Sequence, residues 1–154
     1  MKNIESIWVS GIPENINPDD IMQEQDLLDF ALKFTLENLV KGCKVEGINN
    51  DLKKFPHLII NKGNIRYGIV VVPCVYPNFF EDNKEFRLEF VKNSTLFGMV
   101  PVICPIIIRS TDEARANASI TLKRDSFNLI NPGMKILTPE ENQDLSYESM
   151  DFKF

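Results

Sequence analysis

Few side chains in this sequence stand at the spacing that a catalytic site requires. His57 is the one histidine, so a serine or cysteine nucleophile has no other imidazole base, and no GxSxG motif accompanies it. The glycine-rich loops that bind phosphates, GxxxxGK[ST] and GxGxxG, are also missing. By motif, therefore, the sequence predicts neither nucleophilic catalysis nor phosphate binding.

The three cysteines, Cys43, Cys74 and Cys104, argue against a metal centre. They lie far apart in the sequence, form no CxxC pair and have one histidine to join them, so a zinc ion would lack ligands. Cys74 and Cys104 fall inside apolar runs, where cysteine behaves as a small hydrophobic residue. We expect buried free thiols and predict no cofactor.

Three residues are candidates for binding. Arg109 and Arg115 flank a helix start at Ser110, where cationic side chains and backbone N–H groups attract anions. The alternative, which we favour, pairs these arginines with the nearby Asp112 and Glu113. For His57 the choice is between a ligand role and that of a hydrogen-bonded structural residue, and again we favour the second.

A β-hairpin is the element around which these residues are arranged. Two apolar runs, Leu58 to Ile60 and Ile69 to Val72, flank the polar segment 61–64, and Gly63 can adopt positive φ at no steric cost. Lys44 to Ile48 is expected to form an edge strand before this hairpin.

Helices and a buried strand surround the hairpin. Asn17 and Pro18 predict the start of a long amphipathic helix that ends at Gly42. A second helix is expected to bury Phe86, Phe90, Val91 and Phe97 and to end at Gly98. The run from Met99 to Arg109 predicts a buried strand with an irregularity at Pro105.

The remainder of the chain predicts smaller elements. Residues 4–9 form a short strand, and Ser110 and Glu113 fit a capping box that opens a helix to about Ala118. Alternating apolar residues on either side of 123–126 predict a second hairpin. Residues 1–137 are expected to make one α/β domain, and 138–154 an acidic tail that is either loose or docked through its few large apolar side chains.

The predicted order of elements is αβββαβ, a mixed central sheet flanked by helices. With this order the chain resembles the PD-(D/E)XK nuclease-like superfamily, the restriction-endonuclease-like fold, over about residues 18–109. In active members, as the resemblance implies, a Pro-Asp at the second strand and a Glu-X-Lys on the third hold Mg²⁺ and activate water.

At the matching positions the catalytic side chains are replaced. The Pro-Asp falls on Pro56 and His57, and the Glu-X-Lys falls on Val70, Val71 and Val72. Valine offers neither an oxygen nor a proton, so we expect a catalytically inactive protein with a binding or structural role. The alternative is a nuclease or hydrolase with a rearranged metal site, built on His57 or on a relocated acid. Those relocated acids would be Glu37, Glu46 and Glu89.

Charge and hydropathy limit the partners. The chain of 154 residues has a net charge of −5, and residues 138–154 hold five acids and one lysine. Residues 1–40 are acidic and 41–73 basic, which indicates complementary surfaces within one domain and gives no basic patch for nucleic acid. No apolar run approaches the roughly 20 residues that cross a bilayer. We expect a cytoplasmic protein that binds another protein or a second copy of itself; a third reading is an accessory protein whose acidic tail engages a basic partner.

Overall fold

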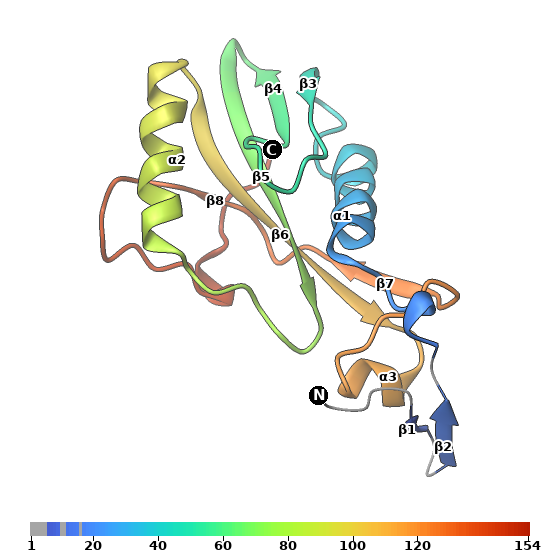
Figure 1. The fold of residues 1–154 in the computed structure, drawn as a ribbon. Coiled ribbons are helices and arrows are strands. Elements are labelled where there is room, and N and C mark those ends of the chain that lie inside the picture. The colour runs from blue at the N-terminus through green and yellow to red at the C-terminus, as the bar shows by residue number, and fades with distance from the viewer. Residues whose placement is uncertain (1–5, 10–11, 16) are drawn as a thin grey trace.

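A mixed sheet of six strands lies between helices in the computed structural model, which describes residues 6–9, 12–15 and 17–154. The strands follow the order β3-β4-β5-β6-β7. Strand β8 pairs with the same edge of β6 as β7 does, nearer the start of β6. Helices α1 and α2 lie on either side of the strands (Figure 1). The bounds of these elements are β3 Lys44–Ile48, β4 Leu58–Lys62, β5 Ile65–Val75, β6 Val100–Ser110, β7 Phe127–Ile130, β8 Lys135–Ile136, α1 Glu24–Asn38 and α2 Lys84–Leu96.

The predicted central hairpin is confirmed as β4 and β5. Its turn is tighter than the sequence indicated, because both Gly63 and Asn64 take positive φ, 60° and 64°. Two successive residues with positive φ are typical of the type I′ turn, which matches the twist of paired strands. Strand β3 pairs with β4 on the open edge of the sheet, as predicted.

The predicted start of the first helix is wrong. Asn17 does cap, but it caps a single 3-10 turn, Pro18–Asp20, after which Ile21 is extended. The helix does not continue here because the backbone pairs with residues 121 and 122: Ile21 bridges to Leu122, and Met22 N–H donates to the Thr121 carbonyl. Helix α1 therefore begins at Glu24, where the Gln23 N–H donates to the Asp26 carboxylate at 2.8 Å, as in one half of a capping box.

Strand β6 runs parallel to β5, and α2 makes the crossover between them. The predicted irregularity at Pro105 does not occur, since the register is unbroken from Val100 to Ile108. The carbonyls of Pro101 and Pro105 accept hydrogen bonds from Leu137 N–H and Asn131 Nδ2. The N–H that each proline lacks would point toward that same β7/β8 side, where β6 has no continuous partner, so no ladder bond is lost.

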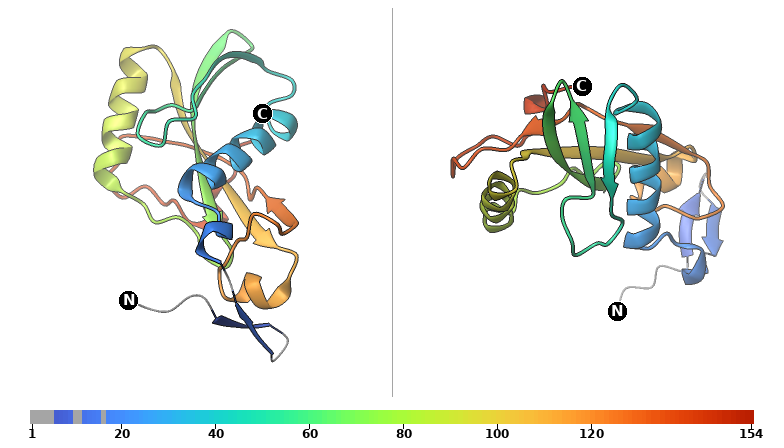
Figure 2. Two further views of the ribbon diagram at one scale, coloured as in Figure 1. Left: turned by 45° about the vertical axis from the view of Figure 1, so that its right-hand side comes forward. Right: turned by 90° about the horizontal axis from the view of Figure 1, so that it is seen from above.

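The second predicted hairpin is also wrong. Residues 120–122 form no strand, and β7 pairs with β6 instead. The short helix before it is confirmed as α3 (Glu113–Asn117), although Asp112 and not Ser110 caps it. The backbone strands β1 (Ser6–Val9) and β2 (Ile12–Asn15) form a separate ribbon near α3 (Figure 2). Residues 4 and 5 of the predicted first strand lie outside the described residues.

The two faces of the sheet bury separate apolar clusters. On the α1 face, Leu28 and Leu32 pack with Leu58, Ile69 and Val71. On the α2 face, Phe90 and Val91 pack with Val70 and Ile103. The tail docks on the body: Leu145 and Met150 are buried in the α2-face cluster, and Phe152 and Phe154 pack against the other.

The tail is held in place by Arg87 of α2, whose side chain is 1% exposed. Its guanidinium pairs with Asp82 at 3.0 Å and donates to the backbone carbonyls of Glu140 and Glu141. In the part of the chain that the structure describes, no helix has the length and apolar character needed to cross a membrane.

Candidate functional site

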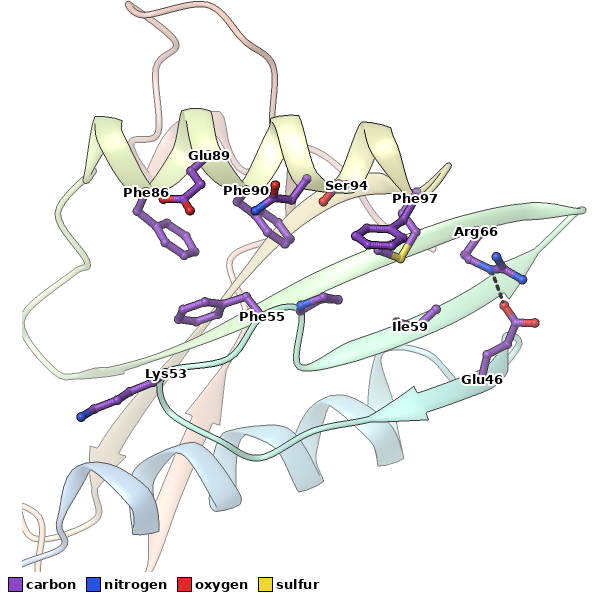
Figure 3. Close-up of a pocket in the computed structure, with 13 residues that line it drawn as sticks. Glu46, Lys53, Phe55, Ile59, Arg66, Phe86, Glu89, Phe90, Ser94 and Phe97 are labelled. Carbon is purple, nitrogen blue, oxygen red and sulfur yellow. Dashed lines mark hydrogen bonds and ion pairs between the residues drawn. The ribbon is translucent and has the colours of Figure 1, made fainter.

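A cleft of about 900 Å³ lies between α2 and the sheet, and we call it the α2 groove. One wall is the inner side of α2, and the other is formed by β3, β4, β5 and the segment before β4. Figure 3 shows the two walls facing each other, with Phe86, Phe90 and Phe97 directed from the helix toward the strands. The groove lies within the size range of small-molecule sites.

Two glycines flank Ile59 on the neighbouring strands at this level of the sheet. Gly47 pairs with Ile59, and Ile59 pairs with Gly68, so two of three neighbouring strands present no side chain at this level. A Cβ at Gly47 would meet only the Ile59 side chain, at 3.7 Å or more. At Gly68 the space is filled by Met99 and Pro56, both 3.4 Å from the position of a Cβ. Of the two glycine positions, only Gly47 therefore leaves free space above the strand backbone.

Aromatic rings form one end of the groove. The Phe55 ring meets Phe86 edge-on, with centroids 4.7 Å apart, and Phe86 stacks on Phe90 at 5.8 Å. Phe97 closes the other end and is 71% exposed. The prediction that Phe97 faces the core is thus wrong; as the residue after the last turn of α2, it lies over the groove.

The charged side chains that line the groove are only partly paired with one another. Glu46 and Arg66 form an ion pair of 2.8 Å, and this hydrogen bond lowers the pKa of the Glu46 carboxyl. Lys53 lines the opening and its amine extends away from the helix (Figure 3). Glu89 projects from α2 between Phe86 and Phe90, and no ion pair joins it to a described residue.

His57 is buried, 3% exposed, and is not among the residues that line the groove. Its backbone N–H donates to Ile69 and its carbonyl accepts from Asn49, so it extends the sheet ladder. Its Nδ1 accepts the Val71 N–H at 3.0 Å, which leaves the proton of the neutral ring on Nε2. Burial lowers the pKa of His57, and the Asp51 charge partly opposes that shift.

The residues at the positions to which the resemblance would assign metal ligands come together at this point. Val70 and Val72 belong to the α2-face cluster, and His57 bonds the Val71 backbone between them. Of the three acids considered as substitutes, Glu46 and Glu89 line the groove but lie apart in Figure 3. Glu37 sits on α1, on the opposite side of the sheet, 3.9 Å from Lys33. Among the described residues, no three histidine, cysteine or acidic side chains are grouped as metal ligands.

The two candidate arginines make internal contacts. Arg115 binds Asp125 with two hydrogen bonds and lies 3.6 Å from Asp112, as part of the pairing that the sequence indicated. Arg109 places its guanidinium 4.4 Å from the Tyr76 ring centroid. The partners Asp125 and Tyr76 were missed because both depend on how β7 and the end of β5 fold back on β6.

The cysteines are free thiols. Burial raises the pKa of Cys74 to about 11 and that of Cys104 to about 12, so neither forms a reactive thiolate at neutral pH. Cys43 is partly exposed, and burial raises its pKa as well.

The groove itself was not predicted from the sequence. Its signals were Gly47 inside an edge strand and Gly68 inside a buried strand, since a glycine within a strand often marks a close approach or a bulge. A bulge indeed lies between Val45 and Gly47. Comparison of the chain with protein-family models, with curated proteins and with solved structures gave no match in any of the three.

Proposed function

We propose that this protein is a catalytically inactive relative of the restriction-endonuclease-like fold that acts as a binding component, with the α2 groove as its ligand site. The observation that carries the proposal is the replacement of the metal-binding positions by His57, Val70 and Val72. The two valines are packed in the apolar cluster on the α2 face. Nδ1 of His57, the ring nitrogen that could bind a metal without losing a proton, accepts the Val71 N–H instead.

The order of elements supports the fold assignment. Helix α1 precedes three antiparallel strands, and α2 then leads to a fourth strand that runs parallel to the third. This is the αβββαβ arrangement on which the resemblance rests. The groove supports the binding role, because it combines an aromatic surface with a small number of polar groups, as ligand pockets do.

The second candidate is a metal-dependent nuclease with a rearranged site. What favours it is that Glu46 and Glu89 both line the α2 groove. Against it, Glu46 is held by Arg66, and Mg²⁺ binding normally requires carboxylates close enough to share its octahedral shell.

Metal binding and nuclease activity decide between the two candidates. We expect Mg²⁺ and Mn²⁺ to leave the melting temperature unchanged up to 10 mM, on the order of physiological and assay concentrations, since a bound ion stabilises the folded state by mass action. Diamagnetic Mg²⁺ should also leave the amide spectrum unchanged. We expect no cleavage of single- or double-stranded DNA or RNA. Saturable binding of either ion, together with cleavage that Glu46→Gln or Glu89→Gln abolishes, would establish the nuclease instead.

A further inference from the structure

The α2 groove has an unbalanced charge on an aromatic surface. Glu89 lies between Phe86 and Phe90, on the side of α2 that faces Phe55 (Figure 3). The positive groups nearby do not neutralise it: Arg66 is bound to Glu46, and the Lys53 amine extends away from the helix. A carboxylate beside aromatic rings attracts an organic cation, through Coulomb attraction and through the negative faces of the rings.

A second polar group in the groove lacks a partner. Ser94 lies on the same wall of α2 and is 1% exposed, yet its Oγ makes no hydrogen bond. Buried hydroxyl groups are normally paired, so a ligand or water that reached Ser94 Oγ from the groove would gain a hydrogen bond there. Asn93, next to it in the sequence, also lines the groove.

From these features we propose that the α2 groove binds a small organic cation, an ammonium group carried on an aromatic or aliphatic stem. The stem lies on Phe55, Phe86 and Ile59 beside the free space at Gly47, and the ammonium group pairs with Glu89. A free small molecule fits better than a protein segment because the cleft of about 900 Å³ matches a small-molecule site. This inference rests on the groove being the ligand site of the proposed function.

The test uses 3-phenylpropylamine, its neutral analogue 3-phenylpropanol and its anionic analogue 3-phenylpropionate, each titrated into the full chain at pH 7 with amide NMR detection. We expect saturable shifts around Phe55, Gly47 and Glu89, with an affinity in the millimolar range that suits a fragment of this size. The amine should bind at least about fivefold more tightly than the alcohol, and the carboxylate should bind most weakly.

Two variants locate the site. Glu89→Gln should reduce amine affinity about fivefold and leave alcohol affinity unchanged, whereas Glu85→Gln, an exposed acid on the same helix outside the groove, should change neither. Gly47→Leu should block all three ligands, because its side chain enters the groove beside Ile59 without a backbone clash. An unchanged amide spectrum away from the groove verifies that each variant is folded.

Several results would overturn the inference. One is the absence of a saturable shift up to about 20 mM amine, well above the expected millimolar affinity. The others are equal affinity for the amine and the carboxylate, and amine binding that Glu89→Gln does not weaken. Tighter binding of acetyl-Leu-Lys-Leu-amide by more than tenfold would make a protein segment the occupant, and concentration-dependent shifts at the groove without ligand would make it a second copy of the chain. Nuclease activity would disprove the proposed function. The titrations would still show whether the groove prefers the amine, so the two proposals can fail separately.

Discussion

The contacts of His57 fix the protonation state of its ring. Because Nδ1 accepts the Val71 N–H, a proton on Nδ1 would oppose another hydrogen, and burial disfavours the charged ring. Its pKa is therefore lower in the folded than in the unfolded chain, where it is about 6.5. We expect the free energy of unfolding to have its full value above pH 6.5. Below pH 6.5 it should fall by up to about 1.4 kcal/mol per pH unit, until the folded-state pKa is reached.

Urea unfolding at pH 7.5 and pH 5 measures this effect, with His57→Asn as the control. Asparagine Oδ1 can accept the same N–H but does not titrate, so the variant should lose less stability on acidification than the natural chain. With one histidine in the sequence, no other imidazole confuses the comparison. An identical pH dependence in both proteins would show that the folded-state pKa of His57 is not lowered.

Gly133 lies where only a hydrogen fits. Its φ is +125°, and a Cβ there would lie 2.1 Å from the Met150 carbonyl oxygen of the tail. We expect Gly133→Ala to cost about 2–3 kcal/mol in the free energy of unfolding, from backbone strain and displacement of the tail. Gly42→Ala is the matched control, with nothing within 4 Å of its Cβ, and should be neutral or slightly stabilising. A loss under 0.5 kcal/mol at Gly133, the range of ordinary surface changes, would contradict this account.

At the level of single residues, the sequence predicted roles that depend on near neighbours. Asp112 was correctly indicated as a partner of Arg115, since the two are three residues apart on a short helix. Asp125 was not indicated, because its approach depends on the loop after α3. Phe97 was misassigned because its helical spacing fits a core position, although the groove beneath it is open.

At the scale of elements, strands with strong local signals were predicted well. Strand β3 has the predicted bounds, and the turn at Gly63 and the helix end at Gly98 follow from glycine positions with positive φ. The hairpin expected around 123–126 failed for a physical reason: alternation shows that a segment suits a sheet but does not choose its partner. The exposed edge of β6 provided a longer apolar partner for β7.

The contact between α2 and the tail depends on one buried guanidinium. We expect Arg87→Met to lose about 2–4 kcal/mol, since methionine fills a similar volume but leaves the carbonyls of Glu140 and Glu141 without donors. The tail should then open locally, so Glu-specific protease should cleave it at lower concentration. Melting temperature and limited proteolysis measure the two effects.

Lys84→Met is the control for this prediction. Lys84 pairs with Glu141 at 3.0 Å, close to Arg87, but both side chains are exposed. An exposed pair contributes at most about 1 kcal/mol, so this variant should keep the resistance of the tail to protease. If Arg87→Met were equally resistant, the apolar side chains of the tail alone would hold it.

For the whole molecule, the sequence predicted the class of fold but not how the tail completes it. Leu145 and Met150 are separated by polar residues with no helical or strand period, so no pattern marks them as core. The groove could not be predicted either, since it results from residues of α2 meeting three strands that are distant in the sequence. Both features depend on long-range packing.

The cysteines test how cooperatively this assembly unfolds. Cys104 lies on the central strand β6 and is fully buried, so a thiol reagent reaches it only when the sheet opens, while Cys43 is partly exposed. With excess Ellman's reagent at pH 8, we expect one thiol, removed by Cys43→Ser, to react first. Labelling of Cys104 should give the same opening free energy as urea unfolding, because β6 is paired on both edges and Cys104 is fully buried. Labelling of Cys104 much faster than this would show that β6 opens locally and that the sheet does not unfold as one cooperative unit.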